Sequence, residues 1–210
     1  MIHIFLKGGP IMWPLLITSL VALTVVIERF IFILRERSKR QPEVVENILT
    51  TVERGEAPDK NLPPNAAQDF VARTLIYALQ HREQSLSNAL LRAAANELKR
   101  FNRGLAVLDT IITLAPLLGL LGTVTGMIHS FGLLGTSELD APAAITGGIA
   151  EALIATAFGL GIAITALIPF NYLNSRLEEA RHEIEDAATH LELLLIKTQK
   201  TDCVLRTTKP

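Results

Sequence analysis

The stretch GLLGTVTGM, from Gly119 to Met127, lies in the middle of a long apolar segment where a helix is expected, yet it contains three glycines and two threonines. In water, each glycine weakens a helix by about 1 kcal/mol relative to alanine. At 100° per residue, the three glycines and Thr123 fall within an arc of about 100°. This nearly smooth face allows another backbone to approach closely, as small residues do where membrane helices touch. The stretch therefore predicts a membrane helix in close contact with a neighbouring helix.

The apolar residues of the 210-residue chain gather in three blocks, and most charged residues lie between or after them. The blocks comprise residues 11–34, 105–134 and 143–173, and each is long enough to cross a bilayer, which takes roughly 20 residues. A cleaved signal peptide is the alternative for the first block. It is disfavoured because the apolar run exceeds the usual length of about 7–15 residues and resumes after Glu28-Arg29. The predicted fold class is an all-α integral membrane protein with three transmembrane helices.

Basic residues predict how these spans are oriented. Lys and Arg follow the first span, precede the second and follow the third, whereas the connection between the second and third contains none. Because basic residues favour the cytoplasmic side, the predicted order is a periplasmic N-terminus (1–10), the first span (11–34), a cytoplasmic helical region (35–104), the second span (105–134), a periplasmic loop (135–142), the third span (143–173) and a cytoplasmic helical tail (174–210).

Two helices are expected to continue beyond the membrane. Residues 85–103 contain no Pro or Gly, and only Gly104 separates them from the second span, so one helix is expected over residues 85–134. The third span continues without a helix breaker through residues 171–197. A shorter amphipathic helix is predicted at residues 42–54, where apolar residues recur at helical spacing. The predicted fold thus has long cytoplasmic helical extensions.

Small residues on one face of a span are predicted to pack helices together, because lipid provides no hydrophobic drive for helix association. The third span has such a column at a spacing of four, similar to the glycines of the second. The predicted helix-packing residues are Gly119, Gly122 and Gly126 in the second span, and Ala155, Gly159 and Ala163 in the third.

Thr123 and Thr156 are candidates for a polar path through the membrane. In one interpretation each hydroxyl donates to the backbone carbonyl one turn earlier, as membrane threonines commonly do. In the other, the hydroxyls face a narrow wet path. Glu151 is a further candidate, because ionisable residues in spans are costly to bury; its alternative role is an interfacial carboxylate favoured by the helix dipole. No carboxylate lies at the centre of a span, so the chain alone offers no proton carrier at mid-membrane.

Motifs of soluble enzymes are absent from the sequence. It contains no phosphate-binding loop, no Cys/His spacing typical of a metal site, and no convincing nucleophile–base pair. We therefore expect no enzymatic activity, no cofactor and no metal. Cys203 is the single cysteine, so no intrachain disulfide can form.

Two long motifs carry a resemblance to a known family: APLLGLLGTVTGMIHSF (Ala115–Phe131) and GGIAEALIATAFGLGIAI (Gly147–Ile164). With MWPLLITSLVALTVVIERF (Met12–Phe30), they resemble, in order, the three spans of the MotA/TolQ/ExbB proton-channel family, and ExbB/TolQ-type subunits most. One departure is Thr165, where many relatives have proline. Here the proline comes later, at Pro169, so a helix kink is expected to shift by about one turn.

The resemblance implies a homopentamer in the bacterial inner membrane whose pore encloses single transmembrane helices from two copies of an ExbD- or TolR-like partner. The partner helix carries an essential aspartate, the acid that this chain lacks. The family's pore-lining threonines correspond to Thr123 and Thr156, and its intramembrane glutamate to Glu151. Proton flow then performs mechanical work on a periplasmic TonB- or TolA-like protein, energising outer-membrane transport or envelope maintenance.

Three alternatives stay open at this point. A structural membrane scaffold without ion conduction would tolerate loss of the threonine hydroxyls but not Gly122→Leu. A gliding or flagellar-type stator subunit is a second alternative, although a flagellar stator has four spans. A small transporter is disfavoured because the spans contain neither broken half-helices nor central charged residues.

Overall fold

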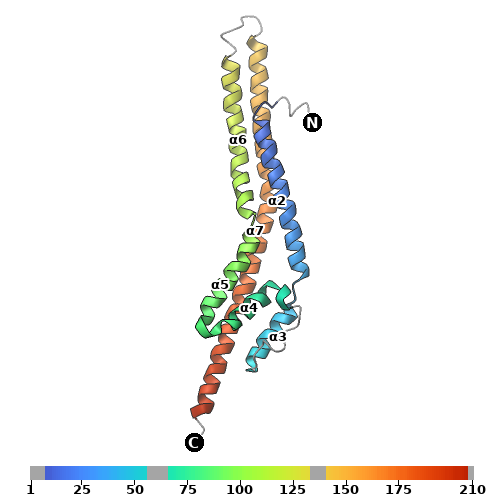
Figure 1. The fold of residues 1–210 in the computed structure, drawn as a ribbon. Coiled ribbons are helices and arrows are strands. Elements are labelled where there is room, and N and C mark those ends of the chain that lie inside the picture. Colours follow the sequence, from blue (N-terminus) through green and yellow to red (C-terminus); the bar gives the residue numbers. More distant parts are fainter. Residues whose placement is uncertain (1–7, 56–65, 133–140, 208–210) are drawn as a thin grey trace. The chain divides into compact units, whose positions relative to one another are not determined.

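The computed structural model describes residues 8–55, 66–132 and 141–207, which are almost entirely helical (Figure 1). No strand occurs in these ranges, so the predicted all-α fold class is confirmed. The elements are α2 (Met12–Ser38), α3 (Pro42–Glu53), the 3₁₀ turn η2 (Ala66–Gln68), α4 (Phe70–Gln80), α5 (Arg82–Asn102), α6 (Leu105–Gly132) and α7 (Ala141–Thr207).

Three helices of the described residues are long and apolar enough to cross a membrane. They are α2, α6 and the part of α7 from Thr146 to Lys197. The extension of the third span is confirmed, because α7 continues without interruption through residues 171–197. Pro169 lies inside α7 and does not end it. Most of the predicted loop at 135–142 lies outside the described residues.

The expected single helix over residues 85–134 is wrong. Its N-terminal part, α5, ends at Asn102, and α6 begins at Leu105. Between them Gly104 has a φ of +85°, a conformation that glycine adopts without the steric cost of a Cβ. A Cβ added to Gly104 would lie 3.1 Å from Cγ1 of Val25 and 3.2 Å from Cδ of Arg29, so the glycine also allows α2 to approach. The sequence identified this glycine but gave no sign of its positive φ.

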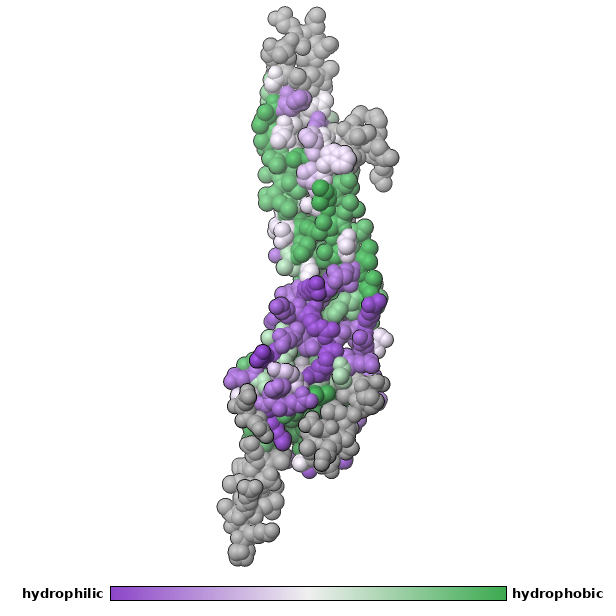
Figure 2. Space-filling model, viewed as in Figure 1, coloured by the Kyte–Doolittle hydropathy of each residue, from purple (hydrophilic) through white to green (hydrophobic). Residues whose placement is uncertain are grey.

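The chain divides into two compact units, each described by itself here. The first, which we call the membrane unit, comprises residues up to Phe30 and residues 104–174; the second, the polar unit, comprises residues 31–103 and those from Ser175 onward. In Figure 2, hydrophobic residues cover the visible spans of α2, α6 and α7, whereas hydrophilic residues cover much of the polar unit. The membrane unit exposes large side chains, among them Trp13, Leu117, Ile128 and Leu153.

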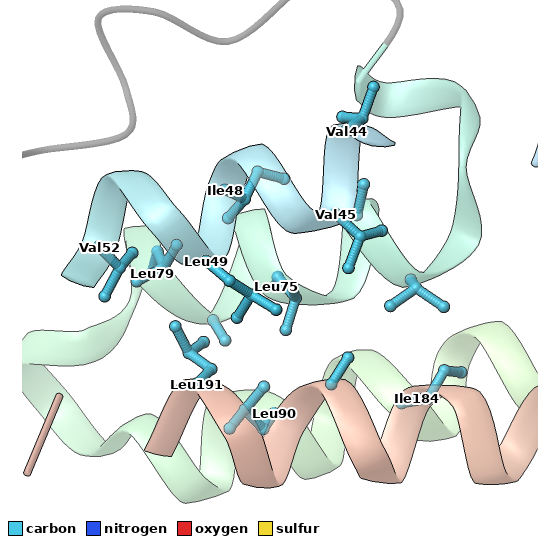
Figure 3. Close-up of a cluster of buried hydrophobic side chains, with 14 of the residues drawn as sticks. Val44, Val45, Ile48, Leu49, Val52, Leu75, Leu79, Leu90, Ile184 and Leu191 are labelled. Carbon is cyan, nitrogen blue, oxygen red and sulfur yellow. The ribbon is translucent and has the colours of Figure 1, made fainter. Parts of the chain in front are cut away.

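The polar unit has a core of large aliphatic side chains. The predicted amphipathic helix at residues 42–54 is confirmed as α3, and its apolar face packs with residues of α4, α5 and α7 (Figure 3). The core includes Val44, Val45, Ile48, Leu49 and Val52 from α3, Leu75 and Leu79 from α4, Leu90 from α5, and Ile184 and Leu191 from α7.

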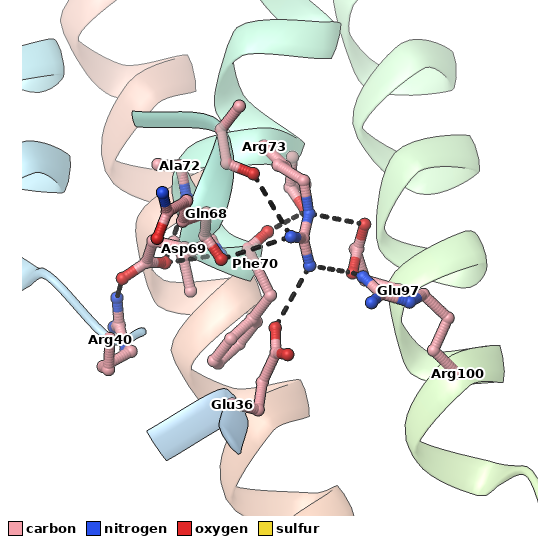
Figure 4. Close-up of polar contacts among 12 residues, drawn as sticks. Glu36, Arg40, Gln68, Asp69, Phe70, Ala72, Arg73, Glu97 and Arg100 are labelled. Atoms are coloured by element: carbon pink, nitrogen blue, oxygen red, sulfur yellow. Dashed lines mark hydrogen bonds and ion pairs between the residues drawn. The ribbon is translucent and has the colours of Figure 1, made fainter. Parts of the chain in front are cut away.

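Asp69 organises one half of a charged network in the polar unit (Figure 4). Its carboxylate caps α4 by accepting hydrogen bonds from the backbone N–H groups of Val71 (2.8 Å) and Ala72 (3.3 Å). It also accepts the backbone N–H of Gln41 (2.7 Å) and pairs with the guanidinium of Arg40. The side chain of Asp69 is fully buried. These contacts compensate the cost of burying a charged group.

Arg73 organises the other half (Figure 4). It binds Glu97 through two nitrogens, at 3.0 and 2.8 Å, and also contacts Glu36 at 3.1 Å. Burial lowers the pKa of Arg73, but the hydrogen bonds and charges of the two glutamates outweigh burial, so that its pKa is raised overall. Through these contacts Arg73 in α4 links Glu36, near the C-terminal end of α2, to Glu97 in α5.

Candidate functional site

The contact between α6 and α7 is so close that the backbones themselves touch. A Cβ added to Gly122 would lie 2.5 Å from the Cβ of Ala155, and one added to Gly159 would lie 2.5 Å from the carbonyl oxygen of Ala115. Real Cβ atoms essentially never approach other heavy atoms within 3.0 Å. A larger side chain at either glycine would therefore force the two helices apart.

The same contact extends toward both ends of the helices. A Cβ on Gly126 would lie 3.0 Å from the Cβ of Ala152. Ala163 lies in a small apolar cluster with Met12, Leu15 and Ala115. The structure thus places all six small residues predicted for helix packing on the buried side of α6 or α7.

Thr156 forms a hydrogen bond across this contact. Its hydroxyl donates to the carbonyl oxygen of Gly119 on α6 at 3.0 Å, whereas the carbonyl of Ala152 in its own helix is 3.4 Å away. Gly119 allows the approach, because an added Cβ there would lie 3.0 Å from the Cα of Thr156. The hydroxyl therefore bridges two helices, a possibility that neither interpretation of the sequence included.

Thr123 lies next to the same peptide group. Its hydroxyl donates to the carbonyl of Leu120 in its own helix at 2.7 Å, in the manner common for membrane threonines. In an α-helix, the carbonyl of Gly119 also accepts the backbone N–H of the residue four positions later, which is Thr123. Both threonines are half-buried, and their hydroxyls donate to consecutive carbonyls of α6, those of Leu120 and Gly119.

Glu151 lies elsewhere on α7. Five residues separate it from Thr156, which corresponds to about 140° around the helix. Its half-buried carboxyl faces Gly9, shortly before α2: a Cβ added to Gly9 would lie 1.7 Å from Oε1 of Glu151. The hydroxyls of Thr123 and Thr156 thus bond neighbouring carbonyls of α6, whereas the carboxyl of Glu151 lies elsewhere, against Gly9.

The described residues contain no cluster of three or more His, Cys, Asp or Glu side chains suited to a metal ion. The contact between Gly9 and Glu151 was not predicted from the sequence. The local sequence, Gly8-Gly9-Pro10, disfavours a helix but says nothing about which residue lies against Gly9. The polar groups described at these contacts are the hydroxyls of Thr123 and Thr156, the backbone carbonyls that they contact, and the carboxyl of Glu151.

Residues 64–186 match the sequence profile of the MotA/TolQ/ExbB proton channel family. The chain belongs to this family. An ExbB-like biopolymer transport protein of Synechocystis sp. (ExbB-like 1) is 38% identical over 197 residues, which cover 90% of this chain and 77% of that protein. The biopolymer transport protein ExbB of Neisseria meningitidis serogroup A is 28% identical over 211 residues, covering 92% of this chain and 96% of that protein.

The Tol-Pal system protein TolQ of Pseudomonas aeruginosa is 39% identical over 115 residues, or 55% of this chain and 43% of that protein. The resemblance inferred from the sequence motifs is thereby confirmed. This family member is a multi-pass membrane protein of a transport-energising, proton-channel type, a class that works in membrane complexes and is not known for enzymes.

Proposed function

We propose that the chain is a proton-channel subunit of the ExbB/TolQ type, assembled as a homopentamer in the bacterial inner membrane with its N-terminus in the periplasm and its C-terminus in the cytoplasm. Its pore encloses the single span of an ExbD- or TolR-like partner that carries an aspartate. Proton flow drives mechanical work on a periplasmic TonB- or TolA-like protein, energising outer-membrane transport or envelope maintenance. Family membership and the distribution of basic residues support this proposal.

The observation that carries the proposal is that the hydroxyls of Thr123 and Thr156 donate to consecutive carbonyls of α6, those of Leu120 and Gly119. Other threonines of these spans, such as Thr125 and Thr165, donate only to carbonyls of their own helix, whereas Thr156 donates to the neighbouring helix. Both threonines are half-buried rather than enclosed, so each hydroxyl retains a side open to a neighbour. In the proposed channel, that neighbour is the partner helix. Glu151 contributes to the proton path at a separate position, near the periplasmic end of the third span.

The direction of the hydrogen bonds indicates what the threonines offer. A hydroxyl has one hydrogen to donate and two lone pairs that accept. The hydrogen of Thr123 is directed to Leu120 and that of Thr156 to Gly119, so the remaining capacity is acceptor only. Such a surface binds groups that donate, such as a protonated carboxylic acid or water. We infer that the threonines stabilise the partner's acid in its protonated form, by about 1 kcal/mol per hydrogen bond.

The partner's acid makes a direct test possible. We expect liposomes containing this chain and an ExbD- or TolR-like protein from the same organism to take up protons under an imposed membrane potential. Liposomes containing this chain alone should not, because no carboxylate lies at mid-membrane in its spans. A pH-sensitive dye measures the flux, and native mass spectrometry of the same preparation should show five copies of this chain. Equal flux with and without the partner, or no flux in either case, would contradict the proposal.

A further inference from the structure

At Gly8 and Gly9, just before α2, an added Cβ would meet side chains of α2 and α7. At Gly8, an added Cβ would lie 2.6 Å from Sδ of Met12 and 3.2 Å from Cγ2 of Ile154. At Gly9, it would lie 1.7 Å from Oε1 and 2.7 Å from Cδ of Glu151. The obstructing group at Gly9 is therefore the carboxyl of Glu151, the only charged side chain among residues 143–173.

Gly9 also lies just before the first helix, α2. Its φ is +71°, and its carbonyl accepts the backbone N–H of Met12 at 3.2 Å in the turn that leads into α2. Side chains other than glycine rarely adopt this φ. The carboxyl of Glu151 thus lies against the backbone of the turn that leads into α2.

We propose that Gly9 is a positioning residue for Glu151. The glycine turn holds the carboxyl near the outer end of the third span, on the side of α7 away from the Thr156 contact. The first span then belongs to the machinery of the proton path, although it contributes no side chain to that path. This inference rests on the proposed function, in which Glu151 is a proton-path residue.

Gly55 provides a matched control. Its φ is +74°, close to that of Gly9, but an added Cβ there would meet nothing within 4 Å. The variant Gly55→Ala therefore reports the conformational cost of placing a side chain at positive φ. The variant Gly9→Ala reports the same cost plus the collision with Glu151. The difference between the two variants isolates the contact.

A double-mutant cycle tests the contact without reference to proton conduction. We expect Gly9→Ala to lower the apparent Tm of the purified protein more than Gly55→Ala does. In a Glu151→Ala background, the effect of Gly9→Ala should shrink to that of Gly55→Ala, because the colliding group is gone. An equal effect of Gly9→Ala in both backgrounds would overturn the contact. If Gly9→Ala alone fails to assemble, recovery of assembly in Gly9→Ala/Glu151→Ala supports the contact, and no recovery overturns it.

Proton flux through the complex with its single-span partner tests the positioning role. We expect Gly9→Ala to reduce flux at least tenfold and Gly55→Ala to leave it unchanged. Because aspartate is one methylene shorter, Gly9→Ala/Glu151→Asp should conduct as well as Glu151→Asp alone. Equal flux in these two variants would show that Gly9→Ala acts through the carboxyl of Glu151, because a general loss of structure would lower the flux of the double variant as well.

The outcomes distinguish this inference from the proposed function. If the wild-type complex conducts and Gly9→Ala conducts at the same rate, positioning by Gly9 is overturned and the proposed function stands. If the double variant conducts less than Glu151→Asp alone, positioning is likewise overturned. If the wild-type complex does not conduct, the proposed function fails and the role in the proton path fails with it, whatever the stability cycle shows about packing.

Discussion

The two units of this protein are built on opposite principles. The membrane unit buries glycine and alanine where α6 meets α7 and exposes leucine, isoleucine and tryptophan. The polar unit buries leucine, isoleucine and valine and covers them with charged residues. In water, burying apolar area drives packing, whereas in lipid the drive comes from close backbone contact and polar bonds between helices. Each core therefore reflects the solvent around it.

The two units also differ in the polar groups that hold their helices together. The polar unit holds Asp69 and Arg73 in networks of fully partnered charges (Figure 4). The α6–α7 contact of the membrane unit uses neutral hydroxyls and carbonyls instead, with Thr156 bridging to Gly119. Substitutions that are harmless in one unit should therefore be damaging in the other.

The largest effect is expected at Gly159. We expect Gly159→Leu to abolish assembly, because an added Cβ would already lie 2.5 Å from the Ala115 carbonyl oxygen. Gly161 is the matched control: it lies two residues further along α7, and a Cβ there would meet nothing within 4 Å. Size-exclusion chromatography of detergent-solubilised protein measures assembly. If Gly161→Leu disrupted assembly as severely as Gly159→Leu, close α6–α7 packing would not be the cause.

In the polar unit, removing bulk should be the damaging change. Leu191 has no exposed surface, and Leu191→Ala should destabilise the unit by about 3 kcal/mol through loss of burial and creation of a cavity. At this chain length that corresponds to a fall in apparent Tm of about 6–12 °C, measured by circular dichroism. Leu193 is 61% exposed, so Leu193→Ala should change the Tm little. Similar losses for both variants would contradict the assignment of the core.

A smaller effect is expected from the buried carboxylate. Asp69→Asn keeps the size of the side chain but removes its charge, and it should cost about 2 kcal/mol. The cost stays below that of a fully buried pair because Arg40 also contacts Glu183 and is partly exposed. Glu183→Gln, at an exposed partner of the same arginine, should cost less than about 1 kcal/mol. Thermal unfolding compares the two, and an equal effect would show that burial does not determine the value of this ion pair.

The smallest predicted loss of stability comes from changing the shape of the cationic group at Arg73. Arg73→Lys retains the charge but loses the paired contacts with Glu97, and it should cost about 1 kcal/mol. Arg100 contacts the same glutamate from one turn away on the helix surface, and Arg100→Lys should lie within about 0.5 kcal/mol of wild type. Unfolding curves that rank the two variants in the opposite order would argue against the network as described.

The features that sequence predicts well here are those set by neighbours along the chain. Hydrophobic periodicity and length were sufficient to predict the three spans, α3 and the long α7. The break before α6 was missed because Gly104 reveals its positive φ only when the backbone is in place. The ion pair between Arg40 and Glu183 joins residues 143 positions apart, and no local pattern encodes it.

At the candidate site, too, the sequence predicted which residues matter locally but not their distant contacts. Composition and helical spacing were sufficient to select Thr123, Thr156 and the glycines beside them as candidates. They could not predict that Thr156 donates to Gly119, or that Glu151 faces Gly9, because both contacts depend on how helices far apart in sequence approach each other.

The most direct test of the central claim is proton flux through liposomes containing the complex of this chain with its single-span partner. The variant Thr123→Val/Thr156→Val removes both hydroxyls at nearly constant volume, and Thr123→Ser/Thr156→Ser retains them. We predict that the valine variant loses at least about tenfold in flux, equivalent to about 1.4 kcal/mol, while the serine variant conducts at close to the wild-type rate. A valine variant that assembles and conducts like the wild type would contradict a proton path along Thr123 and Thr156 and would favour a structural scaffold.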